Sequence, residues 1–226
     1  MVVLATKLYV EGDARERSLD SLRSLVTNEI GELDVEFDIG IRHDDFPSVT
    51  IEGEDATVAR NVLREEFGEI VPDLEAGSTY TGTFETWDDD GFILDAGQGE
   101  GVRIPTDELG LGPGSATQIR ERYGLVQHTP LQFVYGGDDD PSRLAEEEQD
   151  RLYEWSRGNG RLNVNSATRA EVRATLNRAG HAQDYVTVER LGLLEQSVIC
   201  TENTDPPGLL ASVGEYLPAE LRCVVP

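Results

Sequence analysis

Arginines gather in one stretch of a chain that is otherwise strongly acidic. The 226 residues carry a formal net charge of −25, yet the segment Arg151–Arg178 holds six arginines against two acids, a local charge of +4. Arginine binds phosphates and carboxylates through paired hydrogen bonds. A glycine turn separates Arg157 from Arg161, and such a turn can present backbone N–H groups to an anion. Arg169 and Arg173 lie one helical turn apart near the expected start of a helix, where the helix dipole favours anions.

These four arginines are therefore candidates for binding RNA or another anion. The alternative is that they form internal salt bridges with some of the 44 acidic residues of the chain. The two interpretations predict different structures. Arginines and exposed aromatic rings gathered on one face favour RNA binding, whereas dispersed and ion-paired arginines favour a protein–protein adaptor.

Residues suited to catalysis are few. The runs Asp88–Asp90 and Asp138–Asp140 each lie beside glycine and could bind Mg²⁺, but we expect them to be solvated turns. The three histidines lie far apart, and the sequence contains no nucleophile elbow and no phosphate-binding loop. Cys200 and Cys223 each lie in an apolar run, which is typical of buried free thiols. We therefore expect no enzyme, no metal site and no cofactor, with a metal-dependent enzyme as a lesser alternative.

The composition predicts a protein adapted to molar salt. Lys7 is the single lysine beside 18 arginines, and acids outnumber bases by 44 to 19. At about 1 M salt the Debye length falls to roughly 3 Å, so that neighbouring carboxylates repel one another little. The chain has no apolar run of the ~20 residues that a membrane span needs, and it has no signal-peptide pattern. We expect a cytoplasmic protein of a halophile, with its cysteines reduced.

The periodicity of apolar residues predicts an α+β protein with three folded parts. Residues 1–76 show the order βαββα, starting with a strand over residues 2–10, and this order is typical of a ferredoxin-like domain. Residues 77–138 contain short strands and glycine turns, as in a small β-barrel. A linker helix is expected in residues 139–160.

The last part, residues 161–226, shows the order βαββαβ, so we expect a second ferredoxin-like domain there. Thr168 and Glu171 have the spacing of a capping box at the start of its first helix.

The middle part resembles an S1-like oligonucleotide-binding (OB) barrel over about 60 residues. The resemblance starts at Gly82 and continues through the segments "GFILDAG" and "GVRIPTDEL". It implies that aromatic residues on the barrel stack on bases and that a basic residue holds phosphate, namely Phe84, Trp87, Phe92 and Arg103. Phe84 and Phe92 fit equally well as core residues. The net charge of −9 over residues 77–140 departs from this pattern and predicts weak binding of nucleic acid by the barrel alone.

The whole chain resembles the archaeal domain-of-unknown-function family 2110 in its haloarchaeal form. The resemblance rests on "VTIEGEDATVARNVLREEFGEI", on the barrel segment and on "ERLGLLEQSVICTENTDPPGLLASVG". It implies an archaeal, cytoplasmic protein associated with information processing. Our expectation is a non-enzymatic RNA-binding or RNA-machinery accessory protein whose partner is RNA or a ribonucleoprotein. The alternative is a protein–protein adaptor associated with the transcription apparatus.

Overall fold

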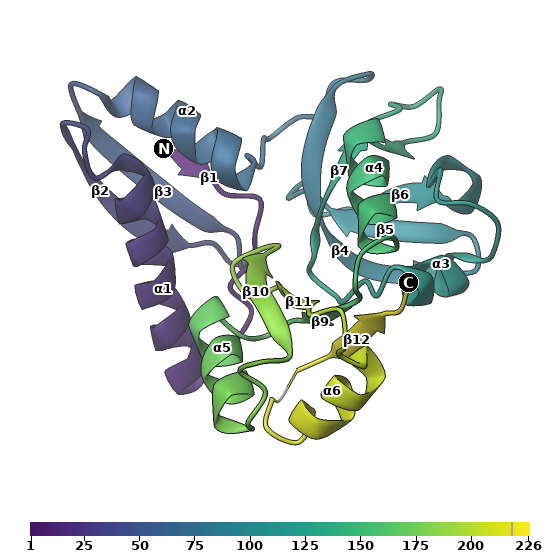
Figure 1. The fold of residues 1–226 in the computed structure, drawn as a ribbon. Helices are drawn as coiled ribbons and strands as arrows, with labels where there is room; N and C mark the ends of the chain where they lie inside the picture. Colours follow the sequence, from purple (N-terminus) through teal and green to yellow (C-terminus); the bar gives the residue numbers. More distant parts are fainter. Residues whose placement is uncertain (218) are drawn as a thin grey trace.

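The computed structural model describes residues 1–217 and 219–226, and this part of the chain contains six α-helices and three small antiparallel sheets (Figure 1). The α+β class expected from the sequence is confirmed. We call the three parts, each built on one sheet, the N-terminal unit (β1 to α2), the central unit (β4 to α4) and the C-terminal unit (β9 to β12). No helix in the described residues is both long enough and apolar enough to cross a membrane.

The N-terminal unit packs two helices on a three-stranded sheet of order β1-β3-β2. Leu22, Val26 and Ile30 recur at a spacing of four residues and bury one face of α1. Gly68 ends α2 with φ +73°, and a Cβ atom there would lie 2.9 Å from the side chain of Thr81 in the central unit, so glycine permits the close approach of the two units. The elements are β1 (Val2–Val3), α1 (Gly12–Ile30), β2 (Val35–Ile41), β3 (Pro47–Gly53) and α2 (Ala56–Phe67).

The first strand is much shorter than the sequence predicts. Only Val2–Val3 pairs with β3, followed by an isolated bridge from Leu4 to Glu69. Residues 4–10, which we call the strap, continue away from this sheet and run between the other two units. The strap resembles a strand in sequence because Leu4 and Leu8 are apolar, but both are buried in the N-terminal core as residues outside the paired strand β1.

The central unit is a five-stranded sheet of order β6-β5-β4-β7-β8. In this order β6 and β8 are the two edges, so the recorded strand pairings give an open sheet. Its elements are β4 (Thr79–Asp88), β5 (Gly91–Asp95), β6 (Val102–Pro105), a short 3-10 helix (Thr106–Glu108), α3 (Ala116–Arg122), β7 (Pro130–Val134), β8 (Arg143–Leu144) and α4 (Glu146–Trp155).

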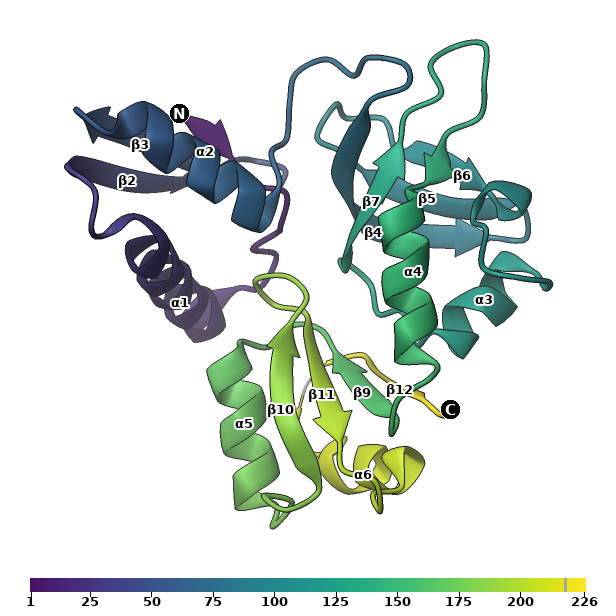
Figure 2. The same ribbon diagram turned by 45° about the horizontal axis from the view of Figure 1, so that its top comes forward.

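Helix α4 occupies the segment expected to be a linker. Leu152 and Trp155 are buried in the hydrophobic core of the central unit, and the helix lies against this sheet (Figure 2). The helix therefore belongs to the central unit and does not bridge the units through solvent.

The C-terminal unit is a four-stranded sheet of order β10-β11-β9-β12 with two helices on one face. The expected capping box of Thr168 and Glu171 is present at the start of α5. Cys200 is buried and Cys223 is half-buried, and both are free thiols. The elements are β9 (Arg161–Val164), α5 (Arg169–Arg178), β10 (Tyr185–Arg190), β11 (Gln196–Cys200), α6 (Pro206–Val213) and β12 (Leu221–Val224).

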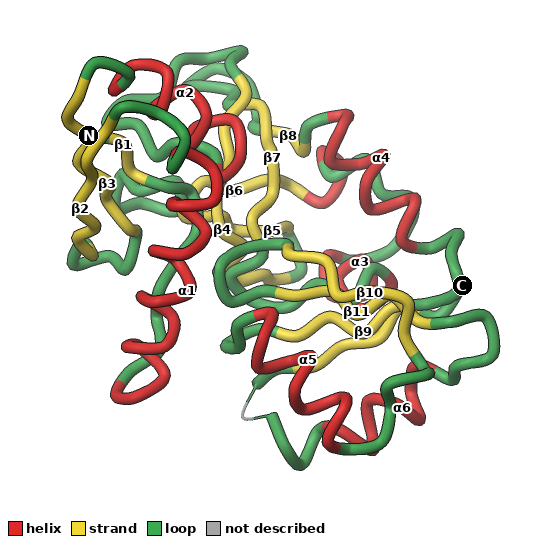
Figure 3. Tube along the Cα trace, turned by 60° about the vertical axis from the view of Figure 1, so that its left-hand side comes forward, coloured by secondary structure: helices red, strands yellow, loops and turns green. Residues whose placement is uncertain are grey.

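The three units share their cores. Leu193 and Leu194 of the C-terminal unit belong to the N-terminal core, and Val224 belongs to the central core. Helix α1 lies beside α5, where Arg17 donates to Glu171 at 2.8 Å. Figure 3 shows the C-terminal sheet with α5 and α6 on one side and the central unit on the other.

Candidate functional site

The three arginines predicted around the barrel and the glycine turn are all engaged in ion pairs. Arg103 places both terminal nitrogens of its guanidinium on Asp88, at 2.7 Å each. Arg157 pairs with Glu154 at 3.0 Å. Arg161 pairs with Glu189 at 2.5 Å, and its guanidinium carbon lies 5.4 Å from the Trp155 ring.

Arg169 and Arg173 differ from these three residues. Both side chains are exposed on α5, and neither takes part in an ion pair within the described residues. The structure therefore divides the predicted arginines into three that form ion pairs within the chain and two that form none within the described residues.

The barrel aromatics are largely interior residues. Phe84 and Phe92 are fully buried in the central core with their ring centroids 4.8 Å apart. Phe92 cannot stack on a base without opening that core, which corrects its predicted role. Trp87 is half-buried, and the guanidinium carbon of Arg120 lies 3.5 Å from the centroid of its ring. The alternation that places Phe92 and Leu94 of β5 on the same face also points Phe92 into the core.

Two helices cover one face of the C-terminal sheet, and part of its other face packs against the central unit. On this other face the Asn163 side chain donates to the Gly124 carbonyl at 2.9 Å. Val224, on the same sheet, is buried in the central core. Phe84, Phe92 and this part of the C-terminal sheet are thus involved in packing within the chain.

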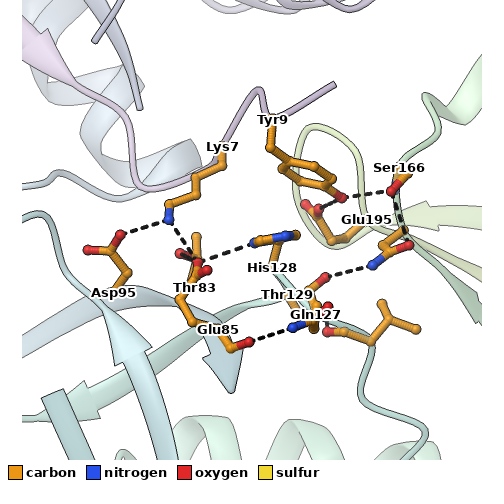
Figure 4. A network of polar contacts seen from close by, with 12 residues as sticks. Lys7, Tyr9, Thr83, Glu85, Asp95, Gln127, His128, Thr129, Ser166 and Glu195 are labelled. Atoms are coloured by element: carbon orange, nitrogen blue, oxygen red, sulfur yellow. Dashed lines mark hydrogen bonds and ion pairs between the residues drawn. The ribbon is translucent and has the colours of Figure 1, made fainter. Parts of the chain in front are cut away.

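The structure brings together a polar network that the sequence analysis missed, at the junction of the three units (Figure 4). Lys7 of the strap is only 7% exposed and donates to Asp95 at 2.7 Å. It also pairs with Glu85 at 2.9 Å, and Glu85 lies 3.2 Å from His128 Nδ1 and accepts from the Thr83 hydroxyl at 2.7 Å. The strap and two strands of the central unit are joined through these charges.

The carboxyl group of Glu85 is held ionised by this arrangement. Burial raises its pKa, but hydrogen bonds from His128 and Lys7 outweigh burial and lower the pKa to about 2. Burial likewise lowers the pKa of Lys7, and the hydrogen bonds to Asp95 and Glu85 outweigh it and raise the pKa overall. The junction therefore contains a fixed charge pair that is largely shielded from solvent.

A second part of the network joins the strap to the C-terminal unit. The Tyr9 hydroxyl donates to Glu195 at 2.7 Å and accepts from the Ser166 backbone N–H at 2.9 Å. The Tyr9 ring packs on His128 with centroids 3.9 Å apart. Glu195 is fully buried, and its Oε2 has no hydrogen-bond partner within the described residues. Burial raises the pKa of Glu195 to about 8, and burial together with Glu195 also raises the pKa of Tyr9.

Two residues of the junction have backbone conformations that are unusual outside glycine. His128 has φ +68° and Ser166 has φ +57°. Left-handed backbone at such residues costs about 1–2 kcal/mol and persists where surrounding contacts hold it in place. Here the Tyr9 contacts with both residues provide part of that support.

A cleft of about 600 Å³ lies among the three units next to this network, between α2, β4 and the loop before β11. The cleft contains arginines, but most of its charged side chains are already bound to one another in ion pairs. Few charged side chains of the cleft are therefore left to bind a charged ligand. These pairs are Arg60 with Glu69, Arg151 with Glu148, and Arg190 with Glu66.

A second concavity, of about 620 Å³, lies on the central unit between β6 and the loop that leads from β7 to β8. We call it the barrel groove. Its carboxylates are Asp73, Glu100 and Asp140, which are exposed and form no ion pair within the described residues. Among these residues, no group of three or more His, Cys, Asp or Glu side chains is arranged to hold a metal ion.

Models of one protein family match three consecutive parts of the chain. The DUF2110 N-terminal domain matches residues 1–73, the DUF2110 central domain matches residues 74–156, and the DUF2110 C-terminal domain matches residues 159–225. A search of curated proteins found no match.

Proposed function

The chain belongs to the DUF2110 family, and from this premise we propose that it is a non-enzymatic adaptor that binds a partner protein through acidic surface of the central unit. The observation that carries the proposal is the distribution of paired and unpaired charges. Arg103, Arg157 and Arg161 are bound to acids of the same chain, whereas the carboxylates of the barrel groove are not. The groups of the barrel groove that have no ion-pair partner within the described residues are acidic, so they suit a basic protein surface better than a phosphate backbone.

The proposal includes a finer assignment of the three units. The strand orders β1-β3-β2 and β10-β11-β9-β12, with two helices packed on each sheet, support ferredoxin-like units at both ends of the chain. The five strands of the central unit support a partly open OB-like barrel.

This OB-like assignment itself favours a protein partner. OB folds bind oligonucleotides with their second and third strands and with the loops after the first and fourth strands. In this chain those loops carry Asp88–Asp90 and Asp138–Asp140, and all six side chains are exposed. Phosphates approaching this face would meet carboxylates, and phosphate contacts are the main source of affinity in nucleic-acid binding.

RNA binding is a second candidate function, carried by Arg169 and Arg173. These two exposed guanidinium groups lie in the first turns of α5 and have no ion-pair partner within the described residues. In this alternative the protein is an accessory of an RNA machinery and contacts RNA through the C-terminal unit.

Affinity purification at native salt, with and without nuclease, separates the two functions. We expect a protein partner that remains bound after nuclease treatment. Arg157→Lys and Arg161→Lys should leave its recovery unchanged, because both side chains are engaged within the chain. Loss of the partner on nuclease treatment, together with its loss from an Arg169→Ala/Arg173→Ala variant, would establish RNA binding in place of the adaptor.

A halophilic archaeal origin is also part of the proposal, supported by the net charge of −25 and the single lysine. Lowering ionic strength removes the screening between carboxylates and destabilises the compact state. We expect Tm to decrease steadily as KCl is lowered from molar to millimolar concentration, as followed by circular dichroism. A Tm that does not change over this range would contradict the halophilic assignment.

A further inference from the structure

The barrel groove has an apolar floor beneath an acidic rim. Leu74, Val102 and Tyr135 line it together with three prolines, and Leu74 and Tyr135 also pack against the central core. A ligand in the groove can therefore bury an aliphatic stem or a small side chain while its charged ends remain at the rim. Arginine combines these two properties, since its methylene stem packs on apolar surface and its head stays polar.

The unsatisfied groups of the groove are hydrogen-bond acceptors. Gln98 donates its amide nitrogen to the Val71 carbonyl at 2.6 Å, and this leaves its Oε1 buried without a partner in the described part of the chain. Arg103, the single basic residue among those lining the groove, already has its guanidinium on Asp88. This Oε1 atom has almost no exposed surface, so the acceptors open to a ligand are the three carboxylates of the rim.

The groove also runs beside an unpaired strand edge. Strands β6 and β8 are the two edges of the central sheet, and β6 contributes Val102, Arg103 and Pro105 to the lining. Residues of β6 and β8 lie within 8 Å of one another, which is too close for a further strand to be inserted between them. An extended peptide would therefore lie over this seam, with its side chains in the groove.

We propose that the barrel groove binds an extended, arginine-bearing segment of a partner protein. Guanidinium groups of that segment donate to Asp73, Glu100 and Asp140, and the stems between them cover Leu74 and Val102. At molar salt the long-range attraction between charges is screened, so the affinity comes from direct contacts. In such contacts the planar guanidinium of arginine binds a carboxylate through paired hydrogen bonds, which the ammonium of lysine cannot form. This inference rests on the proposed adaptor function and names the partner chemistry of the same surface.

The experiment measures fluorescence anisotropy in 2 M KCl with a fluorescein-labelled heptapeptide of alternating arginine and valine. The variant Glu100→Gln/Asp140→Asn removes two groove carboxylates. The matched control, Glu36→Gln/Asp38→Asn, removes two exposed carboxylates on β2, distant in sequence and in another unit. We expect the groove variant to bind about a hundredfold more weakly, since it loses two hydrogen bonds to charged groups and each is worth about a factor of ten. The control should bind as the unmodified protein does, and a lysine–valine peptide should bind more weakly than the arginine peptide.

Three results would overturn the proposal: no binding of the arginine peptide by the unmodified protein, equal weakening by both double variants, or tighter binding of a decauridylate than of the peptide in the same groove. Repeating the affinity purification with the groove variant separates this inference from the adaptor function. If the nuclease-resistant partner is still recovered in full, the groove is not its binding site although the adaptor function stands. If even the unmodified protein recovers no such partner, the adaptor function itself is wrong.

Discussion

Replacing Arg120 with methionine should lower the free energy of unfolding by about 3–5 kcal/mol, the usual cost of removing one partner from a buried ion pair. The Arg120 side chain is 2% exposed and its guanidinium pairs with Glu220. Glu220 also accepts from Arg222 at 2.9 Å and from the Gln127 backbone N–H at 2.9 Å, so a partly compensated carboxylate remains after the substitution. We therefore expect the lower end of this range.

Urea denaturation followed by tryptophan fluorescence measures this effect, because Arg120 lies against Trp87. The control is Arg103→Met, which breaks an ion pair of good geometry that lies in solvent. Exposed pairs contribute little to stability, so this control should unfold as the unmodified protein does. If the two variants lose the same stability, burial of the Arg120 pair has no energetic consequence and the prediction fails.

Glu195 should make the protein less stable as pH rises from about 4.5 to about 8. Its pKa is raised from 4.5 to about 8 in the folded state by burial. Between these values the folded chain holds a proton that the unfolded chain has released, so each rise in pH favours unfolding. At about 1.4 kcal/mol per pH unit, the loss across this window is on the order of 4 kcal/mol. Glu85, Glu171 and Glu220 have lowered pKa values and titrate below the window.

The variant Glu195→Gln should remove most of this dependence. The amide oxygen of glutamine can still accept from the Tyr9 hydroxyl, but the side chain no longer ionises. We expect denaturation midpoints that are nearly constant from pH 5 to pH 8, and a variant more stable than the unmodified protein at pH 8. Glu215→Gln, at an exposed position, should keep the original slope. An unchanged slope in Glu195→Gln would show that Glu195 does not carry this titration.

Much of the local structure follows from the sequence because it depends on neighbouring residues. The capping box of Thr168 and Glu171 is present as expected, and Leu22, Val26 and Ile30 form the buried face of α1 through their regular spacing. Such features need only side chains three or four positions apart on a helix. The α+β class follows in the same way, from the alternation of two periodicities along the chain.

The strap shows where local patterns mislead. Residues 4–10 have the apolar character of a strand, but their side chains contact all three units. Leu4 and Leu8 pack in the N-terminal core, Lys7 binds the central unit and Tyr9 binds the C-terminal unit. The one sign of this network in the sequence was Lys7, the single lysine of the chain. A lone lysine in an acidic protein indicates that its side chain has a specific partner. Glu85, His128 and Glu195 lie 78, 121 and 188 positions further along the chain, so no spacing in the sequence connects them to Lys7.

The sequence by itself determined the charge, the residue types and the order of helices and strands, because these depend on composition and on nearby residues. It also identified the arginines and aromatics that could bind a partner. Which of them are available depends on how the chain packs: Phe92 is a core residue, Arg103 and Arg161 are ion-paired, and Asp140 has no ion-pair partner within the described residues. The physical reason is that the strength of a charge interaction depends on distance and burial, and both are set by how distant segments pack against one another.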